Sequence, residues 1–125
     1  MAITERKYAG EFILSESPGK ISRDTVVVTV GATTTLQAGQ VLGKITATGK
    51  YVPVANGATP ASDGSQVAAA ILYEQQVNAT GSPVDVDAVV VNWSAEVRKD
   101  GLVWGSSDET DGLAELAANG VKGRD

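Results

Sequence analysis

The sequence predicts a single domain that is mainly β, or α+β with one short C-terminal helix. Three observations support this prediction. The 125 residues include 14 glycines and one phenylalanine, which favours a turn-rich fold with a small aliphatic core. Two valine-rich runs, Thr25–Val30 and Val84–Val91, have the β-branched composition of strands. Only residues 106–118 combine a helix start signal, an apolar stripe and a stop signal.

Residues 1–24 are predicted to form a flexible N-terminal arm, and residues 25–125 the folded domain. The arm is rich in charged residues and contains the turn signal Pro18-Gly19; its one apolar cluster is Phe12-Ile13-Leu14. A segment of this composition cannot bury enough apolar surface to stay ordered alone. Two interpretations are open. The arm is either a frayed tail or a segment that becomes ordered on a partner, for example by adding a strand to an open sheet edge.

The first half of the domain reads as strands joined by short turns. Thr25–Val30 is almost purely β-branched, so we expect a strand that is central or buried on both faces. Gly31–Thr35 is expected to be a loop. Val41–Ile45 and Tyr51–Val54 flank a connection that contains Gly49, and this arrangement predicts a hairpin.

The second half continues the β pattern. Asp63-Gly64 predicts a turn, and the apolar run Gln66–Tyr73 predicts a buried strand. Glu74–Pro83 is polar and is expected to be a connector. Val84–Val91 first alternates and then becomes continuously apolar, which is typical of a strand that enters a core from solvent.

The segment after this strand holds both tryptophans. Trp93–Val97 is expected to continue the sheet, Lys99–Gly101 to turn, and Leu102–Trp104 to form a short closing strand. Because aromatic residues are so few, we expect Trp93 and Trp104 to anchor packing or a subunit contact.

The helix prediction rests on signals at both ends. Ser106 and Glu109 have capping-box spacing, and Asn119-Gly120 supplies a stop. These signals, with an apolar stripe at i, i+3, i+4 spacing, predict a helix over about residues 107–119. Gly112 should weaken it by roughly 1 kcal/mol relative to alanine. Such a short helix must dock on the sheet to persist.

Charge and missing residue types exclude several classes of function. The chain has no cysteine and no histidine, which removes disulfides, thiolate chemistry, imidazole catalysis and zinc sites built on these ligands. The net charge of −5 opposes nucleic-acid binding. No apolar run approaches the ~20 residues of a membrane span, and the N-terminus lacks the apolar region of a signal peptide. We therefore expect no membrane partner and synthesis in the cytoplasm.

Asp85 and Asp87 are the arrangement that could suggest an enzyme. At i, i+2 spacing in a strand, the two carboxylates lie on one face. A solvated strand face is the preferred interpretation, because no third acid or base lies nearby in the sequence. We therefore predict that the protein is not an enzyme and has no catalytic residue, cofactor or metal site.

An ordered set of short motifs resembles the head decoration proteins of lambda-type tailed phages, and it covers roughly residues 36–104. The set is Ala38-Gly39-Gln40-Val41-Leu42-Gly43-Lys44, Gly49-Lys50-Tyr51, Asp63-Gly64, Ala69-Ala70-Ile71-Leu72, Ala95-Glu96-Val97-Arg98 and Gly101-Leu102-Val103-Trp104. The resemblance implies a β-clip-like fold, which is a bent ribbon and partial barrel with little helix.

The resemblance also implies a function and partners. Such proteins are homotrimers that bind the major capsid protein at threefold and quasi-threefold sites on the outer surface of the expanded head. They stabilise the shell against the pressure of packaged DNA. The residues of the arm predicted to contact the capsid come from chemistry and position rather than from a motif. They are Phe12, Ile13, Leu14, Ile21 and Arg23.

A second class of function is a small β-barrel binding module on the virion surface. Its ligand would be a carbohydrate or a host-surface molecule, because an exposed face of Trp93 or Trp104 could stack on a sugar ring. Exposure of either indole would favour this alternative, and burial of both would count against it.

Overall fold

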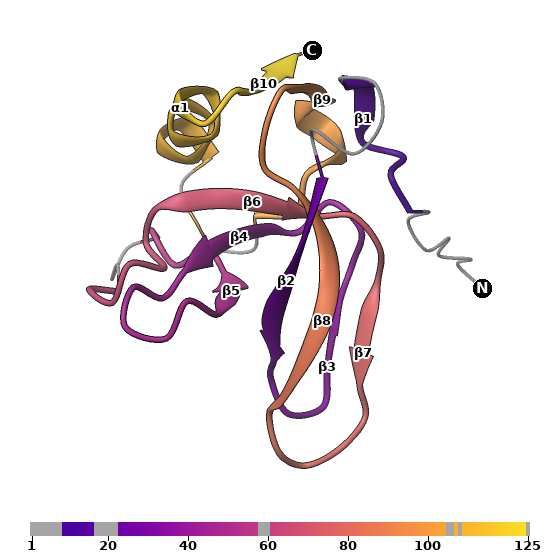
Figure 1. Cartoon of the computed structure of the whole chain (residues 1–125), viewed down its shortest axis with the longest axis vertical. Helices are drawn as coiled ribbons and strands as arrows, with labels where there is room; N and C mark the ends of the chain where they lie inside the picture. Colours follow the sequence, from indigo (N-terminus) through magenta and orange to yellow (C-terminus); the bar gives the residue numbers. More distant parts are fainter. Residues whose placement is uncertain (1–8, 17–22, 58–60, 105–106, 108, 125) are drawn as a thin grey trace, which may run out of the picture.

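The computed structural model describes residues 9–16, 23–57, 61–104, 107 and 109–124 (Figure 1). The fold is mostly β, as predicted. Its α-helix in this described part is α1, Glu109–Ala118, which lies within the predicted range. The predicted capping residue Ser106 lies outside the described residues.

Five strands close into a barrel. Around the barrel they are β2 (Arg23–Val30), β5 (Tyr51–Pro53), β4 (Val41–Lys44), β6 (Ala68–Leu72) and β8 (Val84–Val91). The antiparallel ladder between β2 and β8 runs the whole length of both strands. The predicted hairpin is confirmed as β4 and β5, which pair antiparallel, and Gly49 in its connection has a φ of +74°. A positive φ of this kind favours glycine.

Two smaller sheets extend the barrel at opposite ends (Figure 1). At one end, β9 (Ala95–Arg98) pairs antiparallel with β1 (Ile13–Glu16) and parallel with β10 (Val121–Arg124). At the other end, β3 (Thr34–Leu36) pairs with β7 (Gln76–Asn78). The barrel therefore carries a different addition at each end: α1 lies at the end with β9 and β10, and the β3–β7 ribbon lies at the opposite end.

Two apolar clusters make the core. The first comes from the barrel strands and Leu36, and it occupies the barrel interior: Val28, Val30, Leu36, Leu42, Ala70, Leu72, Ala88 and Val90. The second lies between the barrel, α1 and the β1–β9–β10 sheet: Phe12, Val41, Val54, Ala68, Ile71, Val91, Ala95, Val97, Leu102, Leu116 and Val121. Parts of β4, β6 and β8 supply both clusters, which explains why Val41–Leu42, Ala68–Leu72 and Ala88–Val91 are continuously apolar.

The helix α1 is fixed to the body by one close contact and one polar contact. A Cβ on Gly112 would lie 2.1 Å from Cζ3 of Trp104, so the glycine lets the indole ring pack against the helix. The Glu115 carboxylate accepts a hydrogen bond of 3.0 Å from the backbone N–H of Ala68. This N–H lies beside a register shift in the β4–β6 ladder, and the helix therefore satisfies a donor at that irregularity.

Several sequence expectations were wrong. Thr34–Leu36, expected to be mostly loop, is β3, and β7 lies within the expected connector. Of the expected closing strand Leu102–Trp104, Val103 alone forms an isolated bridge, which pairs it with Gln40. The sequence also missed β10, because its register with β9 is a long-range pairing. For β2, the central alternative is correct, because it pairs with β5 on one side and β8 on the other, but it is not buried on both faces, since Val27 is 37% exposed on the outside of the barrel.

Candidate functional site

The described N-terminal residues lie against the body. The Gly10 N–H donates a hydrogen bond of 2.9 Å to the Tyr73 carbonyl, and the Arg98 N–H donates one of 2.8 Å to the Phe12 carbonyl. The Phe12 side chain is fully buried in the second core cluster. Its Cβ lies beneath Gly101, where an added Cβ would come within 3.1 Å of it. Phe12 therefore packs in the core, although the sequence suggested an arm.

The strand β1 turns the neighbouring apolar residue outward. The register between β1 and β9 shifts between Ile13 and Ser15, so Leu14 has no partner in the ladder. Leu14 is 48% exposed, whereas Ile13 is partly buried against the core. Of the three apolar residues in this cluster, Leu14 is the one that presents its side chain to solvent.

Arg23, the first residue of β2, contacts both the end of β1 and Tyr73. Its guanidinium forms an ion pair with Glu16 at the end of β1, and Nε lies 3.2 Å from a carboxylate oxygen of that residue. Its Cζ lies 4.2 Å from the ring centroid of Tyr73, which is a cation–π contact. The hydrogen bond and charge of Glu16 raise the pKa of Arg23, so the cation persists at any physiological pH.

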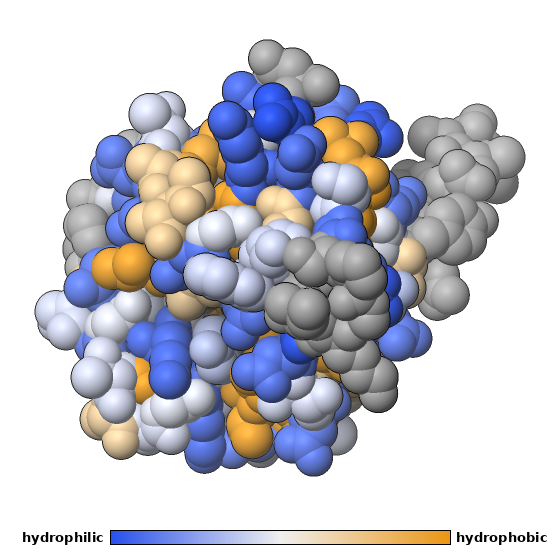
Figure 2. Space-filling view, turned by 45° about the horizontal axis from the view of Figure 1, so that its top comes forward, coloured by the Kyte–Doolittle hydropathy of each residue, from blue (hydrophilic) through white to orange (hydrophobic). Residues whose placement is uncertain are grey.

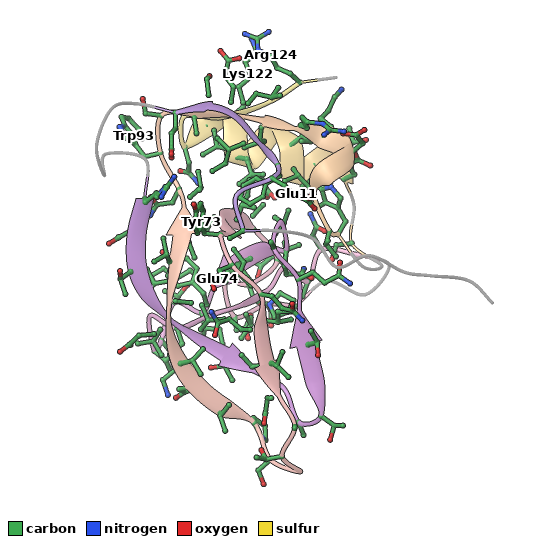
Figure 3. All side chains as sticks on the ribbon, turned by 90° about the vertical axis from the view of Figure 1, so that its right-hand side faces the viewer. Glu11, Tyr73, Glu74, Trp93, Lys122 and Arg124 are labelled. Carbon is green, nitrogen blue, oxygen red and sulfur yellow. The ribbon has the colours of Figure 1, made fainter. Side chains whose placement is uncertain are left out.

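Tyr73 was missed by sequence reasoning. Its backbone carbonyl binds Gly10, its ring meets Arg23, and a Cβ on Gly10 would lie 2.7 Å from the same ring. Tyr73, which is labelled in Figure 3, therefore fixes the positions of residues 10 and 23. No local signal marks this role, because it depends on contacts with residues 50 and 63 positions earlier in the sequence. The other predicted arm residue, Ile21, lies outside the described residues.

The two tryptophans have different environments. Trp104 packs against Gly112 and the second core cluster, and its indole N–H is buried with no hydrogen-bond acceptor in the described part of the chain. Trp93 is 54% exposed and lies at the end of the molecule that carries β10 (Figure 3). The following residue, Ser94, has a φ of +50°, and the ring edge of Trp93 lies against Gly120. Trp104 therefore serves packing, and Trp93 is available for contact.

The two aspartates of β8 are both exposed, and Asp85 is engaged by its neighbours. Lys50 Nζ lies 2.6 Å from one carboxylate oxygen of Asp85, and the Thr29 hydroxyl donates a 2.7 Å hydrogen bond to the other. These two hydrogen bonds lower the pKa of Asp85, and the one from Lys50 has the larger effect. A lowered pKa suits a structural ion pair and opposes a role as a general acid.

Neither a metal cluster nor a membrane helix is found in the described residues. No group of three or more acidic, cysteine or histidine side chains there could hold a metal ion. None of the described helices is long and apolar enough to cross a membrane.

A comparison with protein families supports the structural class of function. The family model of the bacteriophage lambda head decoration protein D matches residues 2–122 of the 125-residue chain. The chain belongs to this family. The family consists of structural capsid proteins of the phage head, and the mostly β structure with its five-stranded barrel is consistent with this assignment. A search of curated proteins found no match.

Proposed function

We propose that the protein binds the expanded phage head as a homotrimer at threefold and quasi-threefold sites. There it stabilises the shell against the pressure of packaged DNA, from the outer surface and in contact with the major capsid protein. The observation that supports this proposal is the family match over nearly the whole chain. The packed barrel interior and the engaged Asp85 fit a structural role.

The N-terminal segment is proposed to carry the capsid contact. Residues 9–16 and Arg23 lie on the side of the fold where β1 forms an edge of its sheet. Within the described part, Leu14 is the exposed apolar residue of the segment, and Phe12 and Ile13 hold β1 against β9. Phe12 therefore acts by positioning β1, and Leu14 is proposed to touch the capsid protein directly.

The threefold symmetry of the proposed trimer explains why it binds only the expanded head. A trimer carries three copies of each contact, and the second and third contacts form at a high effective concentration once the first has formed. Their combined affinity exceeds that of one contact by a factor on the order of 10² or more, provided the lattice presents the matching spacing. Expansion changes this spacing, so the proposed trimer distinguishes the two states of the shell without any chemical step.

Removal of residues 1–8 tests the proposed arm. This truncation leaves Gly10, Phe12 and β1 in place, whereas a start at Thr25 would delete a core residue and a strand. We expect the shortened protein to keep its thermal midpoint and its oligomeric state but to co-sediment more weakly with expanded heads, because part of the proposed arm is removed while Leu14 remains. The Leu14→Asp variant of the full chain should weaken co-sedimentation in the same way. Normal binding by both variants would contradict the proposed contact.

One observation favours the carbohydrate-binding alternative. The exposed Trp93 indole could stack on a sugar ring, whereas Trp104 is packed. This role would be additional to the family's structural role. A glycan array and quenching of Trp93 fluorescence in a Trp104→Phe background test it. Sugar-dependent protection of Trp93 would support the role, and no response across the array would remove it.

A further inference from the structure

The outer face of the β1–β9–β10 sheet is a polar surface that no other element of the described chain covers. In β9, Ala95 and Val97 are buried, so Glu96 and Arg98 point outward. In β10, Val121 is buried and Gly123 faces Leu113 of α1, so Lys122 and Arg124 point outward. Figure 3 shows Lys122 and Arg124 projecting away from the body at this end.

The register of the sheet arranges these side chains in two rows. Ser15, Glu96 and Lys122 are partners across the three strands, and Arg98 is the partner of Arg124 in the next row. A pocket of about 390 Å³ opens on the first row and includes Ser94 and Gly120, which adjoin Trp93. Figure 2 shows hydrophilic residues gathered over this end of the molecule, with smaller apolar areas beside them.

The face is cationic although the protein is acidic. Its cations, Arg98, Lys122 and Arg124, exceed the carboxylates Glu96 and Asp100 by 3 − 2 = 1 charge, and Glu16, which lines the pocket, is neutralised by Arg23; the whole chain carries −5. Arg98 pairs with Asp100, and Arg124 pairs with Glu96. Lys122 is exposed and forms no ion pair with another described residue.

Two features of this face are typical of a binding surface. Arg98 and Arg124 lie opposite each other on neighbouring strands, and each is neutralised by its own carboxylate, so Lys122 is the cation of this face without an ion-pair partner among the described residues. Tryptophan and arginine are also the residues most enriched among the contacts that dominate interface energies, and Trp93 borders the face. An isolated lysine would be explained as protection of the β10 edge against aggregation. That explanation does not account for the exposed indole of Trp93.

We infer that the outer face of the β1–β9–β10 sheet docks on an acidic surface of the phage shell protein, with Lys122 as its unpaired cation and Trp93 at its border. This inference rests on the proposed function. It adds a second contact beside the N-terminal segment, because β1 is a strand of the same sheet. The partner is identified by charge, because a carboxylate-rich polypeptide surface complements this face. The same acidic surface repels the rest of the acidic protein, so this face is the one that docks.

The test compares two lysine reversals that change the net charge equally. Lys122→Glu removes the unpaired cation of the face, and Lys44→Glu removes an exposed lysine at the end of β4 in the barrel. Each protein is titrated against expanded heads at two salt concentrations, after its thermal midpoint and oligomeric state have been checked. We expect Lys122→Glu to weaken binding at least tenfold and to reduce its salt dependence, and Lys44→Glu to stay within about twofold of the wild type. Trp93→Ala should also weaken binding, with little change in salt dependence.

The outcomes separate this inference from the proposed function. If the wild type binds expanded heads and Lys122→Glu binds equally well, the docking face is wrong and the proposed function stands. If the wild type binds no head, both are wrong. If Lys122→Glu and Lys44→Glu weaken binding equally, net charge governs affinity and the face has no special role. Binding to duplex DNA that Lys122→Glu abolishes, with head binding unchanged, would assign the face to nucleic acid instead.

Discussion

Replacement of Phe12 by alanine separates a packed N-terminal segment from a free arm. The Phe12 side chain is 0% exposed and lies in the second core cluster. Truncation of a fully buried phenylalanine costs about 3–5 kcal/mol, because apolar burial is lost and a cavity remains. Leu14 is a matched control, since it lies two residues away and is 48% exposed. Leu14→Ala should therefore cost less than about 1 kcal/mol.

Urea unfolding followed by circular dichroism measures both costs. The wild type and the variants must be compared at one protomer concentration, because the proposed trimer would add a concentration-dependent term to stability. We expect the midpoint of Phe12→Ala to fall far below that of Leu14→Ala. Equal, small effects of the two substitutions would refute the reasoning, because they would mean that residues 9–16 do not contribute to the folded body in solution.

Three further substitutions test other parts of the fold. Gly112→Ala should destabilise the protein by about 1–3 kcal/mol in thermal unfolding, the reverse of its usual effect in a helix, because the new Cβ would clash with Trp104. A stabilised variant would contradict this packing. Asn78→Ala should cost about 2–3 kcal/mol in the same assay, because the buried amide donates to the carbonyls of residues 30, 31 and 82. A change within experimental error would show that water replaces the amide. Lys50→Met should raise the pKa of Asp85 toward its ordinary value in an NMR titration of the carboxyl group. A carboxyl whose pKa is lowered on folding stabilises the protein above its ordinary pKa of about 3.9 and loses that contribution as pH falls through the folded value. The stability difference between wild type and Lys50→Met should therefore vanish in acid, and a difference that persists there would need another cause.

Local pattern was sufficient for the elements whose signals lie within them. The strand β8 begins and ends where the alternation and the apolar run predicted, and α1 ends at its predicted stop signal. Gly49 also marked the β4–β5 connection correctly. In each case the composition or turn chemistry of a few consecutive residues specifies the structure.

The sequence could not reveal pairings made across long distances along the chain. The strand β10 is Val-Lys-Gly-Arg, a composition with little strand preference, and it forms because its parallel register with β9 places Val121 in the core. The polar neighbours of Phe12 favoured an arm, but Val97 and Gly101 provide a site that buries its ring. The candidate site was the hardest part to predict, because the contacts of Tyr73 and the grouping of the cations on one face exist only in the folded chain.

Co-sedimentation with expanded and unexpanded heads of the cognate phage tests the central proposal most directly. The full chain is mixed with each form over a range of concentrations, and bound protein is counted per capsid protein. The proposal requires saturable binding to expanded heads, at a stoichiometry that fills threefold and quasi-threefold sites with trimers, and no binding to unexpanded heads. Equal binding to both forms would contradict selection by lattice spacing, and binding to neither would contradict the decoration role itself.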